Sequence, residues 1–79
     1  MVKAIAHSYW RSIKRGVRTF ESIEDNIKVS KDDPAYANEK QKWMNIMNDV
    51  RALARADVEN GVITAEEYKQ YIGEEYEEG

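Results

Sequence analysis

The chain has 79 residues, no cysteine and one histidine, so it can form neither a disulfide nor a zinc site built from several soft ligands. No segment approaches the roughly 20 apolar residues of a membrane span, and the N-terminus lacks an apolar signal region, which predicts a soluble protein that stays in the cytoplasm where it is made. The net charge of −3 hides a polarised distribution, since residues 1–20 carry +5, residues 21–56 carry −1 and residues 57–79 carry −7.

The first 27 residues predict two short helices separated by a glycine turn. If the segment is wound as a helix, one side holds the apolar residues Ile5, Ala6, Tyr9, Trp10, Ile13, Val17 and Phe20. Gly16 predicts that the first helix ends near Arg15, because glycine is unfavourable inside a helix and favoured just past its end. A second short helix then begins at Thr19 and continues through Ile27, and residues 28–33 form a connecting loop.

A single long helix is predicted from Pro34 to Asn60, and it carries the centre of the core. Its apolar residues follow the spacing of a one-faced helix, namely Trp43, Ile46, Met47, Val50, Leu53, Ala54 and Val58. Asp33 before Pro34 favours a helix start, since aspartate accepts hydrogen bonds from free N–H groups and proline is tolerated in the first turn. Gly61 after Asn60 is typical of a helix end.

The clearest local signal is a capping box at the start of the last predicted helix. Thr64 can accept a hydrogen bond from the third helical residue, Glu67, whose carboxylate reaches back to the threonine N–H. Tyr68, Tyr71 and Ile72 then supply the buried side of a short helix that ends at Gly73. Residues 74–79 are expected to be a mobile acidic tail, with Tyr76 able to pack back onto the domain.

Two segments repeat one pattern, because residues 16–23 and 61–68 both follow G-V-x-T-x-E-x-apolar. Each segment combines a helix end with a helix start. The predicted fold is therefore all-α: a small bundle of about four helices in one domain, residues 1–73, with two helix-corner-helix units around one long central helix.

Residues 60–67 resemble the second half of a calcium-binding loop, but the first half of that loop lacks its ligands. If Gly61 is placed at loop position 6, Glu67 falls at position 12, as such loops require. Positions 1 and 3 then fall on Ala56 and Val58, which offer no side-chain oxygen. We therefore expect a helix corner without a metal or cofactor.

No catalytic constellation is expected, and the chain is predicted not to be an enzyme. His7 is followed by Ser8 and Tyr9, but neighbouring helical residues point in different directions and no third group is available to orient the imidazole. The histidine is therefore interpreted as a surface residue. The glutamates of the last helix and tail are interpreted as a solvated face.

If the first segment is wound as a helix, four cations share the side opposite its apolar residues: Arg11, Lys14, Arg15 and Arg18. They could pack against the acidic C-terminal segment and be neutralised there. They could also follow a nucleic-acid backbone, although the acidic end of the chain would repel phosphate. In the opposite sense, the acidic end could imitate nucleic acid and block a basic host protein.

The C-terminal residues carry a family resemblance. Residues 61–76 run from Gly61 through isoleucine-threonine, paired glutamates and tyrosine to a closing isoleucine-glycine-glutamate-x-tyrosine. This run resembles the C-terminal signature of the small XkdX-type phage proteins, and Tyr9-Trp10 followed by Gly16 agrees with the front of that family. The stretch from about Asn26 to Asn48 departs from the family as an insertion that lengthens the central helix.

The resemblance implies a gene of a tailed phage or prophage of a Gram-positive bacterium, within a late cluster near tail and host-lysis genes. The leading hypothesis is a non-enzymatic structural or assembly adaptor that binds a larger tail or baseplate protein, present in the host cytoplasm during infection or in the virion. The alternatives are an intracellular inhibitor or regulator of a host protein and a nucleic-acid binder, and a homodimer suits each. The expected contact residues form an aromatic and arginine patch typical of interface hot spots: Trp10, Arg11, Lys14, Arg15, Arg18, Tyr36 and Met44. For Trp10, packing in the core is favoured over contact with a partner.

The interpretation of residues 56–67 as an ion-free corner can be tested directly. Because two carboxylate ligands are missing, adding millimolar calcium or another divalent metal should leave both the circular dichroism spectrum and the melting temperature unchanged. A substantial rise in melting temperature would overturn the interpretation.

Overall fold

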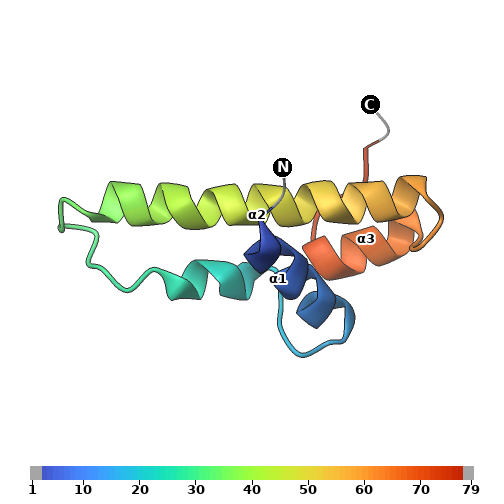
Figure 1. The fold of residues 1–79 in the computed structure, drawn as a ribbon, viewed down its shortest axis with the longest axis horizontal. Helices are drawn as coiled ribbons and strands as arrows, with labels where there is room; N and C mark the ends of the chain where they lie inside the picture. The colour runs from blue at the N-terminus through green and yellow to red at the C-terminus, as the bar shows by residue number, and fades with distance from the viewer. Residues whose placement is uncertain (1–2, 78–79) are drawn as a thin grey trace.

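The structure is a computed structural model that describes residues 3–77, and every regular element in that range is helical (Figure 1). The elements are α1 (Ala4–Lys14), the 3₁₀ helix η1 (Glu21–Asn26), α2 (Tyr36–Glu59) and α3 (Ala65–Ile72). The prediction of a small all-α fold around one long central helix is confirmed.

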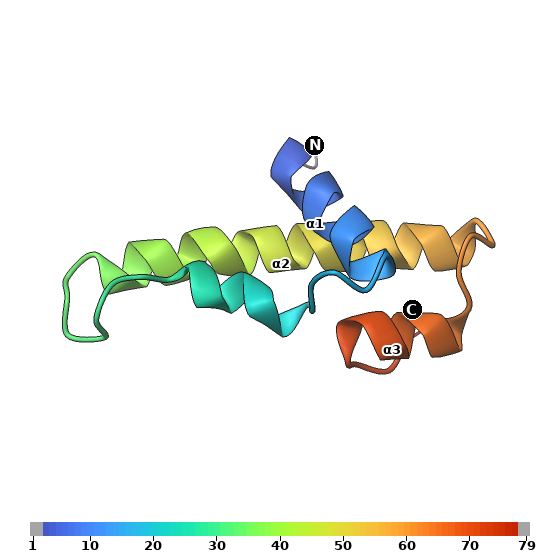
Figure 2. The ribbon, with the colours of Figure 1, turned by 90° about the horizontal axis from the view of Figure 1, so that it is seen from below.

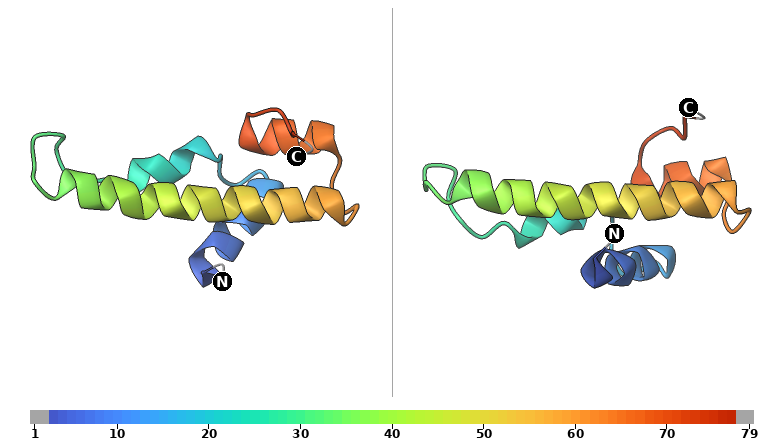
Figure 3. Two further views of the ribbon diagram at one scale, coloured as in Figure 1. Left: turned by 90° about the horizontal axis from the view of Figure 1, so that it is seen from above. Right: turned by 45° about the horizontal axis from the view of Figure 1, so that its top comes forward.

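The three shorter helices pack around the long helix α2. In Figures 1 and 2, α1 crosses α2 at a steep angle, whereas η1 and α3 run alongside it, η1 along its N-terminal half and α3 along its C-terminal half. The view from above in Figure 3 shows α1 projecting on one side of α2 and η1 with α3 on the other. The result is an elongated molecule of 42 × 27 × 23 Å.

One continuous core joins all the helices. Within residues 3–77 it comprises Ala6, Tyr9, Trp10, Ile13, Phe20, Ile23, Ile46, Met47, Val50, Ala54, Ile63, Tyr68 and Ile72. Trp43, Leu53 and Val58 of the predicted α2 stripe are partly buried against this cluster. On the first segment the stripe is shorter than expected, because Ile5 is 39% exposed and Val17 is 69% exposed.

The repeated pattern forms two helix ends of the same geometry. After α1, the Gly16 N–H donates to the Ile13 carbonyl at 3.1 Å, and the Val17 N–H donates to Ser12 at 3.0 Å. After α2, the Gly61 N–H donates to the Val58 carbonyl and the Val62 N–H donates to the carbonyl of Asp57. Each pair of bonds is a Schellman motif, which needs a residue at positive φ, and Gly16 and Gly61 have φ of 76° and 75°.

The helix starts that follow these corners differ. Thr64 accepts a hydrogen bond from the Glu67 N–H at 3.1 Å, and the Glu67 carboxylate accepts from the Thr64 N–H at 2.9 Å, which confirms the capping box of α3. At the first corner, the position equivalent to Glu67 is Ser22, whose hydroxyl donates to the Thr19 carbonyl instead. No reciprocal cap forms there.

The predicted second helix is a 3₁₀ helix of six residues instead of a longer α-helix over 19–27. Its tighter winding places side chains three residues apart on the same side. Phe20 and Ile23 therefore both reach the core, with 3% and 0% exposure, and Asn26 donates to the hydroxyl of Tyr9 at 2.8 Å.

The C-terminal segment lies against the domain as far as residue 77. Arg51 of α2 donates two hydrogen bonds to the Glu74 carboxylate, at 3.0 and 2.9 Å. Tyr76 packs edge-on against Tyr68, with ring centroids 5.3 Å apart, and Arg55 stacks over its ring. The packing of Tyr76 onto the domain is therefore as predicted, and the remainder of the expected tail, residues 78–79, lies outside the described residues.

Replacing the cap of α3 should measurably destabilise the protein. Thr64→Ala removes the acceptor for the Glu67 N–H, and we expect it to lower the free energy of unfolding by about 1 kcal/mol in urea denaturation. Thr64→Ser keeps the hydroxyl and should lose less than half of that. Equal stability of the wild type and the alanine variant would contradict the assigned capping box.

Candidate functional site

The outer surface of α1 and the turn after it carry the strongest basic character in the described chain. The inner side of the helix is buried through Ala6, Tyr9, Trp10 and Ile13. A shallow hollow lies on each flank. One, of about 190 Å³, is lined by Ile5, Ser8, Tyr9, Ser12 and Arg18. The other, of about 300 Å³, is lined by His7, Trp10, Arg11, Lys14, Leu53 and Asp57.

The second hollow is held together by Asp57, near the end of α2. Its carboxylate accepts a 2.8 Å hydrogen bond from the indole N–H of Trp10 and a 3.2 Å bond from the Lys14 ammonium. The Lys14 ammonium also lies 5.2 Å from the centroid of the Trp10 ring. These contacts fix α1 on α2 through side chains that are 47 and 43 positions apart in sequence.

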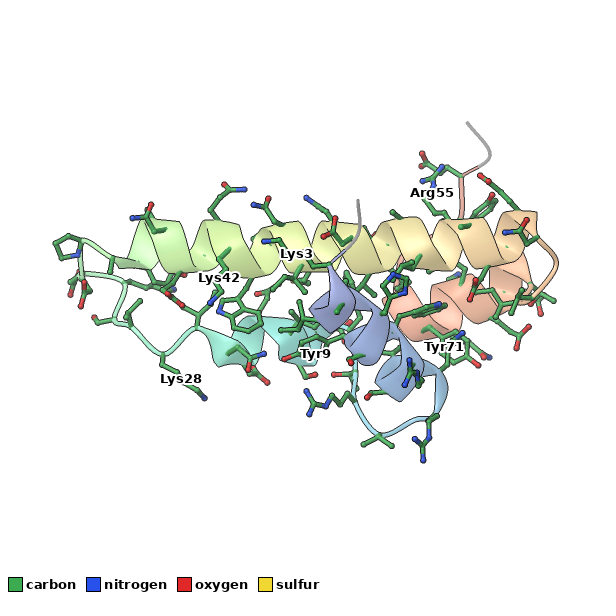
Figure 4. The ribbon with its side chains drawn as sticks, in the orientation of Figure 1. Lys3, Tyr9, Lys28, Lys42, Arg55 and Tyr71 are labelled. Atoms are coloured by element: carbon green, nitrogen blue, oxygen red, sulfur yellow. The ribbon has the colours of Figure 1, made fainter. Side chains whose placement is uncertain are left out.

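Trp10 is a core residue, so the core interpretation favoured for it is confirmed. Its exposed fraction is 4%, and its ring packs edge-on against Tyr71 of α3 with centroids 5.6 Å apart. Figure 4 shows Tyr71 on the part of α3 nearest α1. An indole enclosed in this way supports the surface above it and has little area left for a partner.

The arginines of the basic surface remain available. Within residues 3–77, Arg11, Arg15 and Arg18 are exposed and form no ion pair. Neutralisation of the basic N-terminal segment by acidic residues of the C-terminal segment is realised by Lys14 with Asp57. Arg18 is positioned by stacking over the Tyr9 ring, 5.0 Å from its centroid.

Tyr36 and Met44 do not join this surface. Tyr36 is half-buried and begins α2, at the end of the molecule away from α1 (Figure 1). Met44 is half-buried and packs against the core. Of the predicted contact residues, Arg11 and Lys14 border the same hollow as Trp10, Arg15 caps the end of α1, and Arg18 borders the hollow on the other flank.

Some carboxylates of the acidic C-terminal segment form ion pairs with basic residues of α2 and α3. Arg51 binds Glu74, and Lys69 lies 2.7 Å from the Glu75 carboxylate, whose hydrogen bond raises the pKa of that ammonium above its ordinary value. Burial raises the pKa of the Tyr68 hydroxyl, and the nearby Glu74 carboxylate adds to the rise. In Figure 4, Arg55 lies on the side of α2 where the C-terminal segment passes.

Sequence reasoning missed the roles of Asp57, Arg51 and Arg55. In the sequence Asp57 belongs to the acidic segment, but it also follows Leu53 by one helical turn and so shares its side of α2. That spacing was the one available signal. Arg51 and Arg55 carried none, because their acceptors in the segment 74–77 lie 22 to 23 residues further along the chain.

The structure does not pair His7, as a base, with the hydroxyl of Ser8 as a nucleophile. His7 lines the hollow on one flank of α1, and Ser8 lines the hollow on the other flank. The body of the helix separates the two side chains. In the described range, no group of three or more histidine and acidic side chains is arranged to hold a metal ion.

Residues 56–67 form the predicted corner between α2 and α3. Asp57 is engaged by Trp10 and Lys14, and Glu67 is engaged in the capping box. These carboxylates therefore stabilise the fold around Gly61 instead of converging on a point inside the turn.

Comparison of the chain with protein-family models, with curated proteins and with solved structures finds no match. The resemblance to the XkdX-type proteins thus stays a prediction from the sequence. None of the helices within residues 3–77 is both long and apolar enough to cross a lipid bilayer. The physical properties of the α1 surface are the basis for a functional proposal.

Asp57 is expected to contribute to stability mainly through the indole of Trp10. Asp57→Ala leaves a largely buried donor without a partner, which should lower the free energy of unfolding by about 2 kcal/mol. Asp57→Asn retains an acceptor and should lose less than half as much. Removing only the ion pair, by Lys14→Met, should cost about 0.5 kcal/mol or less because the pair is partly solvated. The three values come from urea denaturation, and equal losses for all three variants would exclude this ranking.

Proposed function

We propose that the protein is a non-enzymatic docking module that binds an acidic surface of a larger protein through the arginines of α1 and its following turn. In the biological setting implied by the XkdX resemblance, the larger protein is a tail or baseplate component and the module is an assembly adaptor. The observation that carries the proposal is the absence of ion pairs at Arg11, Arg15 and Arg18 within residues 3–77.

The electrostatics of the domain support this assignment. Asp57, whose carboxylate borders the hollow beside Arg11, is already engaged, since it accepts hydrogen bonds from Trp10 and Lys14. The domain therefore presents several arginines that form no ion pair within residues 3–77. Such a surface attracts carboxylates of a partner and orients its approach.

The packing beneath the arginines supports specific docking as well. Arg18 stacks on a buried tyrosine, and Arg11 borders a hollow whose floor includes the buried Trp10. A guanidinium held by aromatic packing loses less conformational freedom when it binds a carboxylate. The neighbouring hollow adds Ile5 and two serine hydroxyls, a mixture of apolar and polar groups suited to a protein side chain.

A protein partner is favoured over nucleic acid by the rest of the chain. The net charge is −3, and residues 57–79 alone carry −7. A duplex long enough to contact the arginines would bring many phosphates near these carboxylates, and the repulsion would oppose binding. An acidic patch of limited area on a protein avoids that repulsion.

Neutralising the arginines should remove binding to an acidic polypeptide. The variant R11Q/R15Q/R18Q is compared with the wild type for binding to poly-L-glutamate by fluorescence anisotropy. Because each arginine offers charge-assisted hydrogen bonds, we expect the triple variant to bind at least about tenfold more weakly. The control variant K28Q/K31Q/K40Q loses the same charge from exposed lysines elsewhere and should bind nearly as well as the wild type.

Two results would contradict the proposal. One is equal weakening by the arginine and lysine variants, which would mean that net charge alone governs binding. The other is tighter binding to a DNA duplex than to poly-L-glutamate, with affinity falling steeply as salt rises, which would favour a nucleic-acid binder. For the assembly role, mass spectrometry of purified particles from the source phage or prophage should detect the protein, and its absence would favour an intracellular regulator.

A further inference from the structure

The two glycine corners present a matched pair of surfaces. We define the basic corner as Arg15, Val17 and Arg18, after α1, and the acidic corner as Glu59, Val62 and Glu66, between α2 and α3. Both are built on the same Schellman geometry, so their backbones turn in the same way. They differ in the charges that flank the shared glycine and valine.

The charges of the two corners are complementary. Residues 14–19 contain three basic residues and no acid, and residues 56–67 contain four acidic residues and no base. Within the described range, none of Arg15, Arg18, Glu59 and Glu66 forms an ion pair. The charged side chains of both corners are therefore available for a contact between two molecules.

Each corner also exposes a valine. Val17 is 69% exposed and Val62 is 62% exposed. In a Schellman motif the residue at this position frequently packs back onto the last helical turn, and here both valines stay largely exposed. An apolar centre beside charged residues is the composition of a small protein contact.

The corners lie at separate places on the molecule. In Figures 1 and 2, the turn after α1 lies on the side of the domain where α1 crosses α2, whereas the α2–α3 corner forms one end of the long helix. A molecule does not join its own two corners. A contact between them requires two copies, and because the surfaces are different it repeats head to tail.

We propose that the basic corner of one copy of this chain binds the acidic corner of a second copy. The inference rests on the proposed function, because the same arginines make the contact. One copy docks on the larger protein, and its acidic corner then accepts the basic corner of the next. The association is expected to be weak and strongly weakened by salt, since exposed ion pairs are screened.

Sedimentation equilibrium tests this contact on the full chain. At about 20 mM salt the average mass should rise with concentration above the monomer mass of 9.2 kDa, and at about 0.5 M salt it should return to the monomer value. R15Q/R18Q and E59Q/E66Q should each stay monomeric over the same range. Val62→Ser, at an exposed position, should weaken the association without loss of helicity.

The decisive measurement is the mixture of the two double variants. Each retains one intact corner, so an equimolar mixture should form a dimer of one copy of each and nothing larger. The matched controls K28Q/K31Q and E24Q/D25N change exposed charges elsewhere and should associate like the wild type. Circular dichroism confirms that each variant remains helical.

The possible failures are distinguishable. A wild type that stays monomeric at low salt, or a mixture that stays monomeric, would exclude the head-to-tail contact. If poly-L-glutamate binding still depended on the arginines in that case, the proposed docking function would stand without self-association. If the copies associated while poly-L-glutamate binding ignored the arginines, the docking function would be wrong instead.

Discussion

The position of α1 depends on the hydrogen bond between the Trp10 indole and the Asp57 carboxylate. The other contacts that hold this short helix are apolar packing, which is not directional, the partly solvated Lys14–Asp57 ion pair, and the hydrogen bond from Asn26 to Tyr9. The bond between Trp10 and Asp57 fixes where α1 crosses and which side of it faces outward. The arginines are exposed because the tryptophan one position before Arg11 is committed to the interior. The core and the candidate binding surface thus share one polar contact.

Tertiary contacts, as well as the order of residues in the sequence, determine which charges of this domain are paired. Arg51, Arg55 and Lys69 engage the segment 74–77 and hold it against α2 and α3. Lys14 and Asp57 form an ion pair beside the indole of Trp10. Among the charged residues that form no ion pair within residues 3–77, Arg15 and Arg18 flank one corner and Glu59 and Glu66 flank the other. A domain that neutralised itself fully would have no such polarity to offer a partner.

The sequence predicted the helices well because their ends are chemically explicit. Gly16, Gly61 and the pair Thr64 with Glu67 each specify a local geometry that does not depend on the rest of the fold. The winding of η1 was not predictable in this way, since a six-residue segment takes the form that buries Phe20 and Ile23 best. Local rules also could not pair Trp10 with Asp57, because nothing in the intervening residues indicates which turn of α2 meets α1.

The candidate site was predictable in part for the same reason. The four cations are recognisable from their proximity in the sequence, and the structure distributes them over the end of α1 and the turn that follows it. Tyr36 and Met44 were grouped with them by residue type, and the length of α2 separates Tyr36 from that surface. Residue type can suggest that a side chain suits an interface, but only tertiary structure decides whether several such side chains can touch one partner.

The first half of α2 contributes little to the core, since Ile46 is the first fully buried residue on a helix that starts at Tyr36. The ten residues before Ile46 extend the helix by about 15 Å at 1.5 Å per residue. This length acts as a rigid spacer. The loop ahead of α2 is therefore held at the end of the molecule away from α1, and shortening this part of the helix by whole turns would bring the loop closer to the arginines.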